Sequence, residues 1–272
     1  MKKILLLIIS LFISTSFADE FVDSGSTLGG YGELHWNTKK QEMDFHRFVL
    51  FYGHIWDSNW SFKSDIELEH NTIGGSESDT DGNEHIKYDG ELELEQAYIN
   101  YHSGVWGFKG GVLLAPVGII NPYHEPPAFL SVERPAYAQH IIPTTWFGNG
   151  FSFYGNIGDI GLEFVMLEDL NGGNILDSRS IRDGRNKGSD ATATDLLGTK
   201  IIGLSWTGID GLRVAGSYAM NDAPVTIEES GEATEFVGVA LMEINTTYSK
   251  NNIHTVGFKR DFVCICLEAR NF

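Results

Sequence analysis

Apolar and polar residues alternate along short segments of this chain, most clearly between Trp60 and Glu69. The odd-numbered positions from 63 to 69 are charged, whereas positions 60, 62, 66 and 68 are apolar. Successive side chains of a β-strand point to opposite faces, so this period of two predicts a strand with one charged and one apolar face. Strands of this kind, closed into a barrel, enclose a wet interior and turn their apolar side chains to lipid.

The pattern recurs along the chain and predicts an all-β fold, an antiparallel transmembrane β-barrel with about 11–12 strands present. The segments that we expect to form strands are 29–37, 44–56, 60–70, 90–102, 105–116, 148–156, 160–169, 199–207, 211–221, 237–249 and 253–264. The predicted strand 90–102 changes phase partway along, which a β-bulge near Gln96 would explain. The strand 44–56 is apolar on both sides.

The predicted connections alternate between tight and long. The tight ones are 57–59, 103–104, 157–159, 208–210 and 250–252; the long ones are 71–89, 117–147, 170–198 and 222–236. Outer-membrane barrels have short turns at the periplasmic end and longer loops at the outer end. A soluble β-sandwich, the competing interpretation, gives no reason for such an alternation.

Aromatic residues are placed as a membrane barrel would have them. Four of the six tryptophans adjoin predicted tight turns: Trp56, Trp60, Trp106 and Trp206. We expect them to form an interfacial girdle, with Trp36, Trp146 and Tyr218 at the opposite rim. The alternative is that these aromatic residues belong to the core of a soluble sandwich.

The N-terminus has the features of a secretory signal peptide. Two lysines precede an apolar run at 4–13, and Ser16-Phe17-Ala18 fits a small-x-small cleavage site. The apolar run is too short for a transmembrane helix, although a retained anchor is the alternative. We therefore predict a signal peptide at 1–18, one barrel domain at 19–272, and localisation in the outer membrane of a Gram-negative bacterium.

The chain is acidic, with 37 Asp and Glu residues against 19 Lys and Arg residues and a net charge of −18. This balance argues against nucleic acid as a partner. The two cysteines, Cys264 and Cys266, cannot supply a disulfide framework. The partners that we expect are outer-membrane lipid, lipopolysaccharide and small hydrophilic solutes.

The polar faces of the predicted strands define a candidate pore lining in which acids outnumber bases. Its members are Lys63, Asp65, Glu67, Glu69, Glu91, Glu93, Glu95, Lys109, Glu163, Arg213 and Glu243. Rings of carboxylates favour cations, so a weak preference for cations is expected.

The end of the chain does not fit a closed barrel. An eleventh strand leaves no room for a returning one, whereas bacterial single-chain barrels have an even number of strands. Residues 263–272 hold both cysteines and lack an apolar row before Phe272. We expect a truncation or frameshift near residue 260; the alternative is a smaller natural barrel with an unusual last hairpin.

Several segments of the first half resemble outer-membrane porins related to the phosphate-selective porin O and P group. They are 29–35 (GGYGELH), 44–50 (DFHRFVL), 67–70 (ELEH), 93–98 (ELEQAY), 118–127 (GIINPYHEPP), 132–135 (VERP) and 142–146 (IPTTW). The resemblance implies a diffusion channel of about sixteen strands, usually a homotrimer. Phosphate selectivity is not implied. The resemblance to that group would imply a ladder of Lys and Arg along the pore, whereas the predicted lining of this chain is mainly acidic.

The long loop 117–147 is the best candidate for a constriction. It is rich in proline and contains His124, Glu125, Glu133, Arg134 and His140. Loops of this length are usually functional or disordered, and a stiff loop folded into the lumen would narrow the pore. Alternatively, Glu125 and Arg134 form an ion pair that holds the loop against the wall.

No enzymatic activity, cofactor or metal site is predicted. The chain has neither a Gly-x-Ser-x-Gly elbow nor a His-Glu-x-x-His signature. The acidic loop 71–89 lacks the glycine and the terminal Glu of an EF-hand. His35, His46, His54 and His70 fall on different predicted strands, and their spacing does not indicate a cluster.

The sequence thus favours an outer-membrane porin that passes small hydrophilic solutes or ions by diffusion. A structural or adhesive outer-membrane barrel without channel activity is the first alternative. A secreted, soluble β-sandwich is the second.

Overall fold

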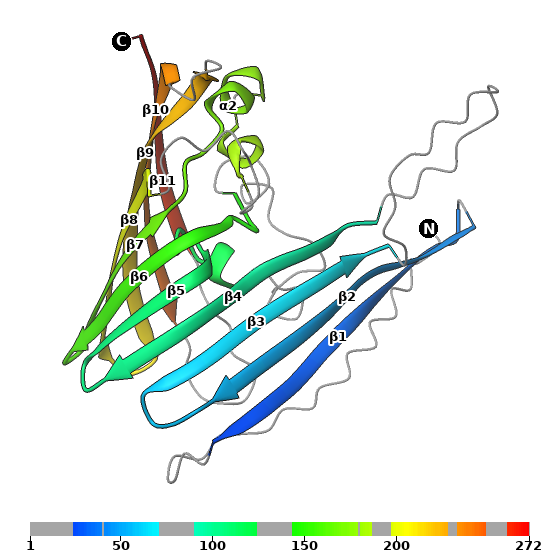
Figure 1. The fold of residues 1–272 in the computed structure, drawn as a ribbon, viewed down its shortest axis with the longest axis vertical. Coiled ribbons are helices and arrows are strands. Elements are labelled where there is room, and N and C mark those ends of the chain that lie inside the picture. Colours follow the sequence, from blue (N-terminus) through cyan, green and yellow to red (C-terminus); the bar gives the residue numbers. More distant parts are fainter. Residues whose placement is uncertain are drawn as a thin grey trace. The chain divides into compact units, whose positions relative to one another are not determined.

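The fold is known from a computed structural model that describes residues 24–39, 41–70, 90–123, 143–178, 180–186, 197–227, 233–248 and 260–271. Residues 42, 226–227 and 260–271 are described by their backbone alone. Within this part of the chain, eleven strands account for most of the residues (Figure 1). Short helices occupy two of the connections.

All the strands except β7, which has 8 residues, are long enough to cross a membrane, since a tilted transmembrane strand needs about 9–11 residues. Their bounds are β1 Gly25–Asn37, β2 Glu42–Ile55, β3 Trp60–Glu69, β4 Leu92–Ser103, β5 Trp106–Leu114, β6 Phe147–Ile157, β7 Ile160–Leu167, β8 Thr199–Ile209, β9 Leu212–Ile227, β10 Ala233–Tyr248 and β11 Arg260–Asn271. The helical segments are η1 Asn121–Tyr123, α2 Gly172–Ser178 and η3 Ile181–Gly184.

The chain divides into two compact units, Met1–Ala97 and Tyr98–Phe272, with the boundary inside β4. In the first unit β2 pairs antiparallel with both β1 and β3. In the second unit each strand from β5 to β11 pairs antiparallel with its neighbour in sequence. The strand order follows the chain from β1 to β11, so the prediction of an all-β antiparallel fold is confirmed.

The lengths of the connections agree with the prediction as far as β9. Tight turns follow β2, β4, β6 and β8, and long connections follow β3, β5 and β7. One prediction is wrong. The predicted loop 222–236 shrinks to 228–232, because β9 and β10 each continue for 16 residues. The predicted tight turn 250–252 lies outside the described residues, and β11, which is described from Arg260, includes the segment that we expected to be atypical.

In both units the apolar side chains that alternate with the polar ones are exposed. In the first unit Leu28, Phe48 and Trp60 are 66%, 44% and 43% exposed. The second unit carries a similar set across five consecutive strands: Phe151, Phe153, Ile160, Leu162, Ile202, Leu204, Trp206, Tyr218, Met220, Met242 and Ile244. Contiguous apolar surface of this kind is rare on proteins that are surrounded by water.

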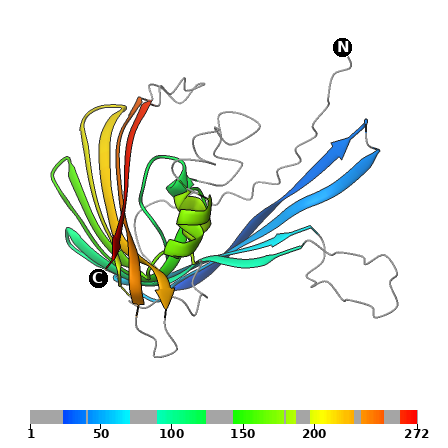
Figure 2. The same cartoon turned by 90° about the horizontal axis from the view of Figure 1, so that it is seen from above.

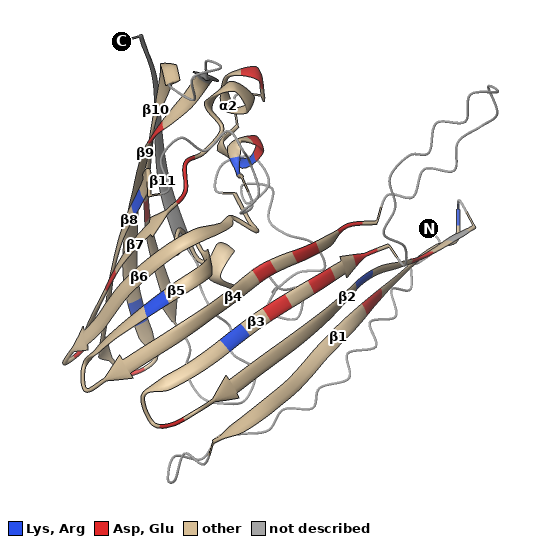
Figure 3. Ribbon diagram, in the orientation of Figure 1, with Lys and Arg blue, Asp and Glu red and all other residues tan. Residues whose placement is uncertain are grey.

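The opposite face of the strands, called here the inner face, contains buried charged and polar residues. Asp65, Glu67 and Glu95 are 2%, 4% and 1% exposed, and Glu243 is also 1% exposed. The acidic residues form a row along β3 and the start of β4 (Figure 3). The distribution is therefore the reverse of that in a water-soluble protein, whose large apolar residues are buried and whose carboxylates are exposed.

The inner face of the second unit also has an apolar zone toward the long loops. Val165, Leu167 and Ile201 pack there with Ile175 of α2 and Ile181 of η3. Figure 2 shows α2 beside the inner side of the curved strands of this unit. The predicted loop 170–198 thus contains a folded segment that covers the inner face near β9.

One of the predicted rim aromatics lies elsewhere. Trp146 is only 3% exposed and belongs to the apolar cluster beneath α2, so the prediction that it marks the outer rim is wrong. Trp36 and Tyr218 are 55% and 44% exposed, as interfacial residues would be. None of the helices in the described residues is long and apolar enough to cross a membrane.

The two faces of β8 make a direct test possible, because Leu204 and Ser205 are adjacent and point to opposite sides. Leu204 is 54% exposed on the outer face, whereas Ser205 lies opposite Ala215, which is buried on the inner face. We expect Leu204→Lys to lower the free energy of unfolding in lipid by about 2–4 kcal/mol, the cost of a lysine near the bilayer midplane. Ser205→Lys is the matched control and should have a much smaller effect.

The measurement is reversible unfolding by guanidinium in lipid vesicles or a supporting detergent. Equal destabilisation by the two lysines would contradict the assignment of the faces.

Candidate functional site

The inner face of the first unit is organised around Arg47 of β2. Its guanidinium lies 3.0 Å from Glu33 on β1 and 2.9 Å from Glu67 on β3, and Glu69 is 3.9 Å away. The strand register explains the contacts, since Glu33 and Glu69 both lie directly opposite Arg47. The side chain of Arg47 is only 7% exposed. One buried cation on β2 therefore links carboxylates from the two strands that flank it, β1 and β3.

Asp65 is the centre of a second polar contact on the same face. The amide of Gln96 donates a hydrogen bond to Asp65, and the ammonium of Lys63 lies 3.3 Å from the same carboxylate. The side chain of Lys63 is 48% exposed, so this pair is open to solvent on one side. Together with Glu95, these contacts continue the acidic row from β3 to β4.

The exposure pattern of β4 changes phase where the sequence predicts it. Leu92 and Leu94 are exposed at the start of the strand, whereas Ile99 and Tyr101 are exposed further along. The exposed positions therefore change from even-numbered to odd-numbered around Gln96. An extra residue in a strand has this effect, because it reverses which face of the sheet the following side chains occupy.

In the second unit, polar residues of the inner face gather in the half nearest the tight turns. The ammonium of Lys109 lies 3.4 Å from Glu163, whose carboxylate also accepts a hydrogen bond of 2.8 Å from Ser152. The same ammonium sits 4.9 Å from the centre of the Tyr154 ring, within the range of a cation–π contact. Tyr154 in turn donates a hydrogen bond of 2.7 Å to Asn100.

A parallel arrangement occupies β9 and β10. Arg213 donates to Asn245 at 3.3 Å, the amide of Asn245 donates to Glu243, and Ser217 donates to Glu243 at 3.0 Å. Glu243 and Ser217 lie directly opposite each other in the register. This carboxylate is therefore held by hydrogen bonds from two neighbouring side chains.

A cavity of about 600 Å³ lies over these polar groups. Its wall includes Lys109, Glu163, Arg213 and Glu243, which are all the predicted pore-lining residues of the second unit. The segment that follows β5 closes part of the cavity with Ile119 and neighbouring residues. The cavity is thus lined by charges of both signs and by the start of a long loop.

The remaining predicted lining residues lie in the first unit. Lys63, Asp65, Glu67 and Glu69 occupy alternate positions of β3, and Glu93 and Glu95 do so in β4. Glu91 precedes β4, where its backbone carbonyl accepts a hydrogen bond of 2.9 Å from the amide of Glu69.

The constriction residues predicted in loop 117–147 are His124, Glu125, Glu133, Arg134 and His140, and all of them lie outside the described residues. The described ends of this loop are joined by the fully buried Asn121. Its side-chain amide donates to the carbonyls of Ala115 at 2.6 Å and Trp146 at 2.9 Å, and its oxygen accepts from the amide of Trp146. Both ends of the loop are therefore fixed to each other beside the inner face.

Two arginines near η3 connect a second loop to this one. Arg182 donates to the carbonyl and hydroxyl of Thr144 at 3.2 and 3.0 Å. Arg185 donates to the carbonyl of Thr145 at 2.9 Å and to its hydroxyl at 2.5 Å. These contacts hold the segment 170–186, called here the inner segment, against the end of loop 117–147.

Sequence reasoning missed Arg47 and Glu33, because the strand that carries Arg47 reads as apolar on both sides. The sequence signal that could have revealed the network was a single arginine within an apolar strand, because an arginine that is buried needs carboxylate partners. Sequence reasoning also treated four histidines as scattered. The structure instead brings His35, His46 and His70 together, while His54 lies near the other end of β2.

No protein-family profile matches the chain. An uncharacterized protein of Aquifex aeolicus (strain VF5) is 36% identical over 186 residues, which are 65% of this chain and 40% of that protein. The chain therefore matches less than half the length of this curated relative.

Two solved structures are similar in outline. They are OmpTdeltaL8, a loop-deletion mutant of an outer membrane protein of Vibrio cholerae, and OccD3 (OpdP) of Pseudomonas aeruginosa. The first is 9% identical with a TM-score of 0.40, and covers 90% of this chain and 83% of that one. The second is 13% identical with a TM-score of 0.34, and covers 89% and 52%. The all-β class of this chain accordingly rests on its own strand pairing.

The Arg47 network leads to a prediction about stability. Removing a buried cation leaves its carboxylates unpaired in a poorly solvated site, which costs about 3–5 kcal/mol. We expect Arg47→Ala to lower the free energy of unfolding by an amount in this range, measured by guanidinium titration in detergent. Lys63→Ala is the matched control on the adjacent strand, and should cost under about 1 kcal/mol because its ammonium is half exposed and Asp65 keeps the hydrogen bond from Gln96. A loss for Arg47→Ala as small as that for the control would contradict the structural role of the network.

Proposed function

We propose that this chain is the wall, or part of the wall, of an outer-membrane β-barrel whose inner face borders a water-filled diffusion path. The observation that carries the proposal is the reversed distribution of residues: charges on one face and exposed aromatic and aliphatic side chains on the other. Lipid satisfies the apolar face, and the charged face is satisfied by ion pairs between strands together with water in a lumen. Paired antiparallel strands satisfy the backbone groups that a membrane interior would otherwise leave without hydrogen bonds.

The solutes that fit this inner face are small, hydrophilic and preferably cationic. In the first unit Asp65, Glu67 and Glu95 are accompanied by the acid Glu93, and Arg47 and Lys63 balance only part of this charge. Carboxylates along a pore attract cations and repel anions, most strongly at low ionic strength. Diffusion through such a path needs no cofactor and no catalytic residue, so the proposal does not include enzymatic activity.

The proposal extends to the surroundings of the protein. Removal of residues 1–18 would release the mature chain into the periplasm, from which it would insert into the outer membrane. The exposed tryptophans beside the tight turns, Trp56, Trp106 and Trp206, are suited to the lipid interface. Outer-membrane lipid and lipopolysaccharide are the expected partners, and assembly as a homotrimer is the expectation from the resemblance to porins.

A structural or adhesive barrel without channel activity is the second candidate, and the inner segment is the observation that favours it. α2 and η3 lie on the inner face and bury Leu167, Ile175 and Ile201 in a dry cluster. A loop that covers the lumen completely would leave a barrel that conducts no ions. Conductance separates the two candidates, since a covered barrel gives none.

Ion selectivity tests the proposed function. The mature chain reconstituted in planar bilayers should conduct, with a reversal potential in a KCl gradient that shows preference for K⁺. Glu163→Gln removes a carboxylate from the cavity and leaves Lys109, so the preference for K⁺ should fall. Asp210→Asn, in the exposed turn between β8 and β9, is the matched control with the same loss of charge and should change little. Clear anion selectivity of the unaltered protein would contradict the proposed cation preference, and absence of conductance would contradict the pore itself.

The inner segment gives a second prediction about the same currents. Replacing both Arg182 and Arg185 by alanine removes the hydrogen bonds to Thr144 and Thr145 that hold this segment in place. The single-channel conductance should therefore rise or fluctuate between levels. Arg213→Ala is the control: it removes a charge from the cavity wall without loosening the segment, so it should change the conductance through charge alone and add no fluctuation between levels. Steady, unchanged conductance in the double variant would show that the inner segment does not limit ion flow.

A further inference from the structure

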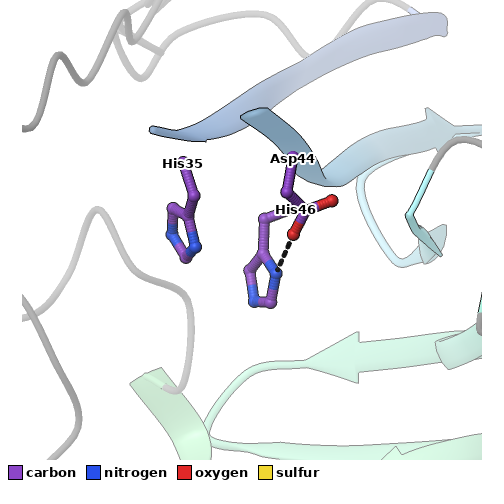
Figure 4. A group of neighbouring side chains, drawn as sticks. All are labelled: His35, Asp44 and His46. Carbon is purple, nitrogen blue, oxygen red and sulfur yellow. Dashed lines mark hydrogen bonds and ion pairs between the residues drawn. The ribbon is translucent and has the colours of Figure 1, made fainter. Parts of the chain in front are cut away.

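Three histidines and an aspartate converge on the inner face of the first unit, at the end of β1 and β2 nearest the connection 38–41. The rings of His35 and His46 stack with centres 4.3 Å apart, and the ring of His70 meets that of His46 at 5.2 Å. Asp44 lies 3.2 Å from His46 and 2.9 Å from His70. One ligand atom each from His35, Asp44 and His46 falls within 4.8 Å of the others (Figure 4).

A β-bulge produces this convergence. The register of β1 and β2 shifts between Glu33 and Leu34, where β2 has one residue more than β1. The register passes from Arg47 to Phe45 and skips His46. An extra residue in one strand turns its side chain out of the regular alternation. His46 and Asp44 consequently reach the face on which His35 and Arg47 already lie.

His70 joins the cluster through an unusual backbone conformation. Its φ angle is +48°, a region that residues other than glycine rarely adopt. Its amide donates to the carbonyl of His46 at 3.1 Å, which fixes the residue just after β3. This position directs the ring toward the carboxylate of Asp44.

The surroundings of the cluster have the second layer of contacts that metal sites require. Glu33 lies 2.7 Å from Nε2 of His35, and Arg47 holds the other oxygen of Glu33 at 3.0 Å. A carboxylate that binds one ring nitrogen of a histidine fixes the ring and leaves the second nitrogen for an ion. The side chains of His35, His46 and Asp44 are 33%, 27% and 37% exposed, so an ion can reach them from water.

We propose that His35, Asp44 and His46, with His70 beside them, bind a divalent transition-metal ion of the Zn²⁺ class. Two or three imidazoles and one carboxylate match the donors that Zn²⁺ and its first-row neighbours prefer, whereas Ca²⁺ and Mg²⁺ select oxygen. The acidic residues of the same face, including Glu67 and Glu69, raise the local concentration of cations. The site does not depend on whether the barrel conducts. The competing interpretation is that the histidines only form hydrogen bonds and ion pairs with Glu33 and Asp44.

Calorimetric titration of the untagged mature chain in detergent with Zn²⁺ tests the proposal. We expect one ion per chain. His46→Gln should weaken binding by about 100-fold or more, and Glu33→Gln by about 10- to 100-fold, the effect of losing an outer contact. His54→Gln is the matched control on the same strand: its ring forms a hydrogen bond of 2.8 Å with Ser26 and meets the Trp56 ring edge-on, outside the cluster. Circular dichroism should show unchanged strand content in every variant.

A second measurement reads out the ligands themselves. Co²⁺ bound in place of Zn²⁺ should give visible d–d absorption bands typical of a site with nitrogen and oxygen donors, and His46→Gln should abolish or shift these bands. Absence of stoichiometric Zn²⁺ binding would overturn the proposal. Equal weakening by His54→Gln and His46→Gln would overturn it as well, because it would indicate binding to scattered surface histidines.

Discussion

The reversed alternation of apolar and charged side chains is the constraint on which the rest of this structure depends. On β10, for example, Met242 and Ile244 are exposed on one face while Glu243 is buried on the other. A strand arranged in this way is stable only at a boundary between two surroundings, with lipid on one face and a polar, hydrated environment on the other. Placing the outer face in water would expose a large apolar surface at a cost of roughly 25 cal/mol for each Å².

The charged inner face imposes its own requirement. Arg47, Asp65 and Glu67 are nearly buried among neighbouring strands, so each needs a partner to offset the loss of hydration. The strand register supplies these partners at fixed positions, as the alignment of Glu33, Arg47 and Glu69 shows. In the second unit the same principle pairs Lys109 with Glu163 and surrounds Glu243 with Ser217 and Asn245. The polar contacts therefore hold neighbouring strands in register and also determine the charge that a solute would meet.

Much of this architecture could be predicted from the sequence, because a period of two reports directly on which face of a strand a residue occupies. The phase change near Gln96 could be predicted for the same reason. The bulge beside His46 could not, since a bulge depends on which residues of two strands pair. The extra length of β9 and β10 was missed because turn-like residues such as Asn221 and Pro224 lie within the long β9.

The inner segment was hidden for a different physical reason. Its apolar residues, Leu170, Ile175 and Ile181, are separated by polar ones and lack the regular spacing of a long helix. They become buried only when the loop folds back onto the wall, which is a tertiary effect. Trp146 was misplaced by the same effect, because it packs beneath this segment instead of facing the membrane interface.

Spin labels on β8 test the two-faced wall most directly. In a chain with Cys264 and Cys266 replaced by serine, single labels at Leu204→Cys and Ser205→Cys would be compared in lipid vesicles by electron paramagnetic resonance. The account predicts that the label at 204 collides with oxygen dissolved in the acyl chains and is shielded from a water-soluble nickel chelate, with the reverse preference at 205. A label at 204 that is as open to the chelate as the label at 205 would contradict it.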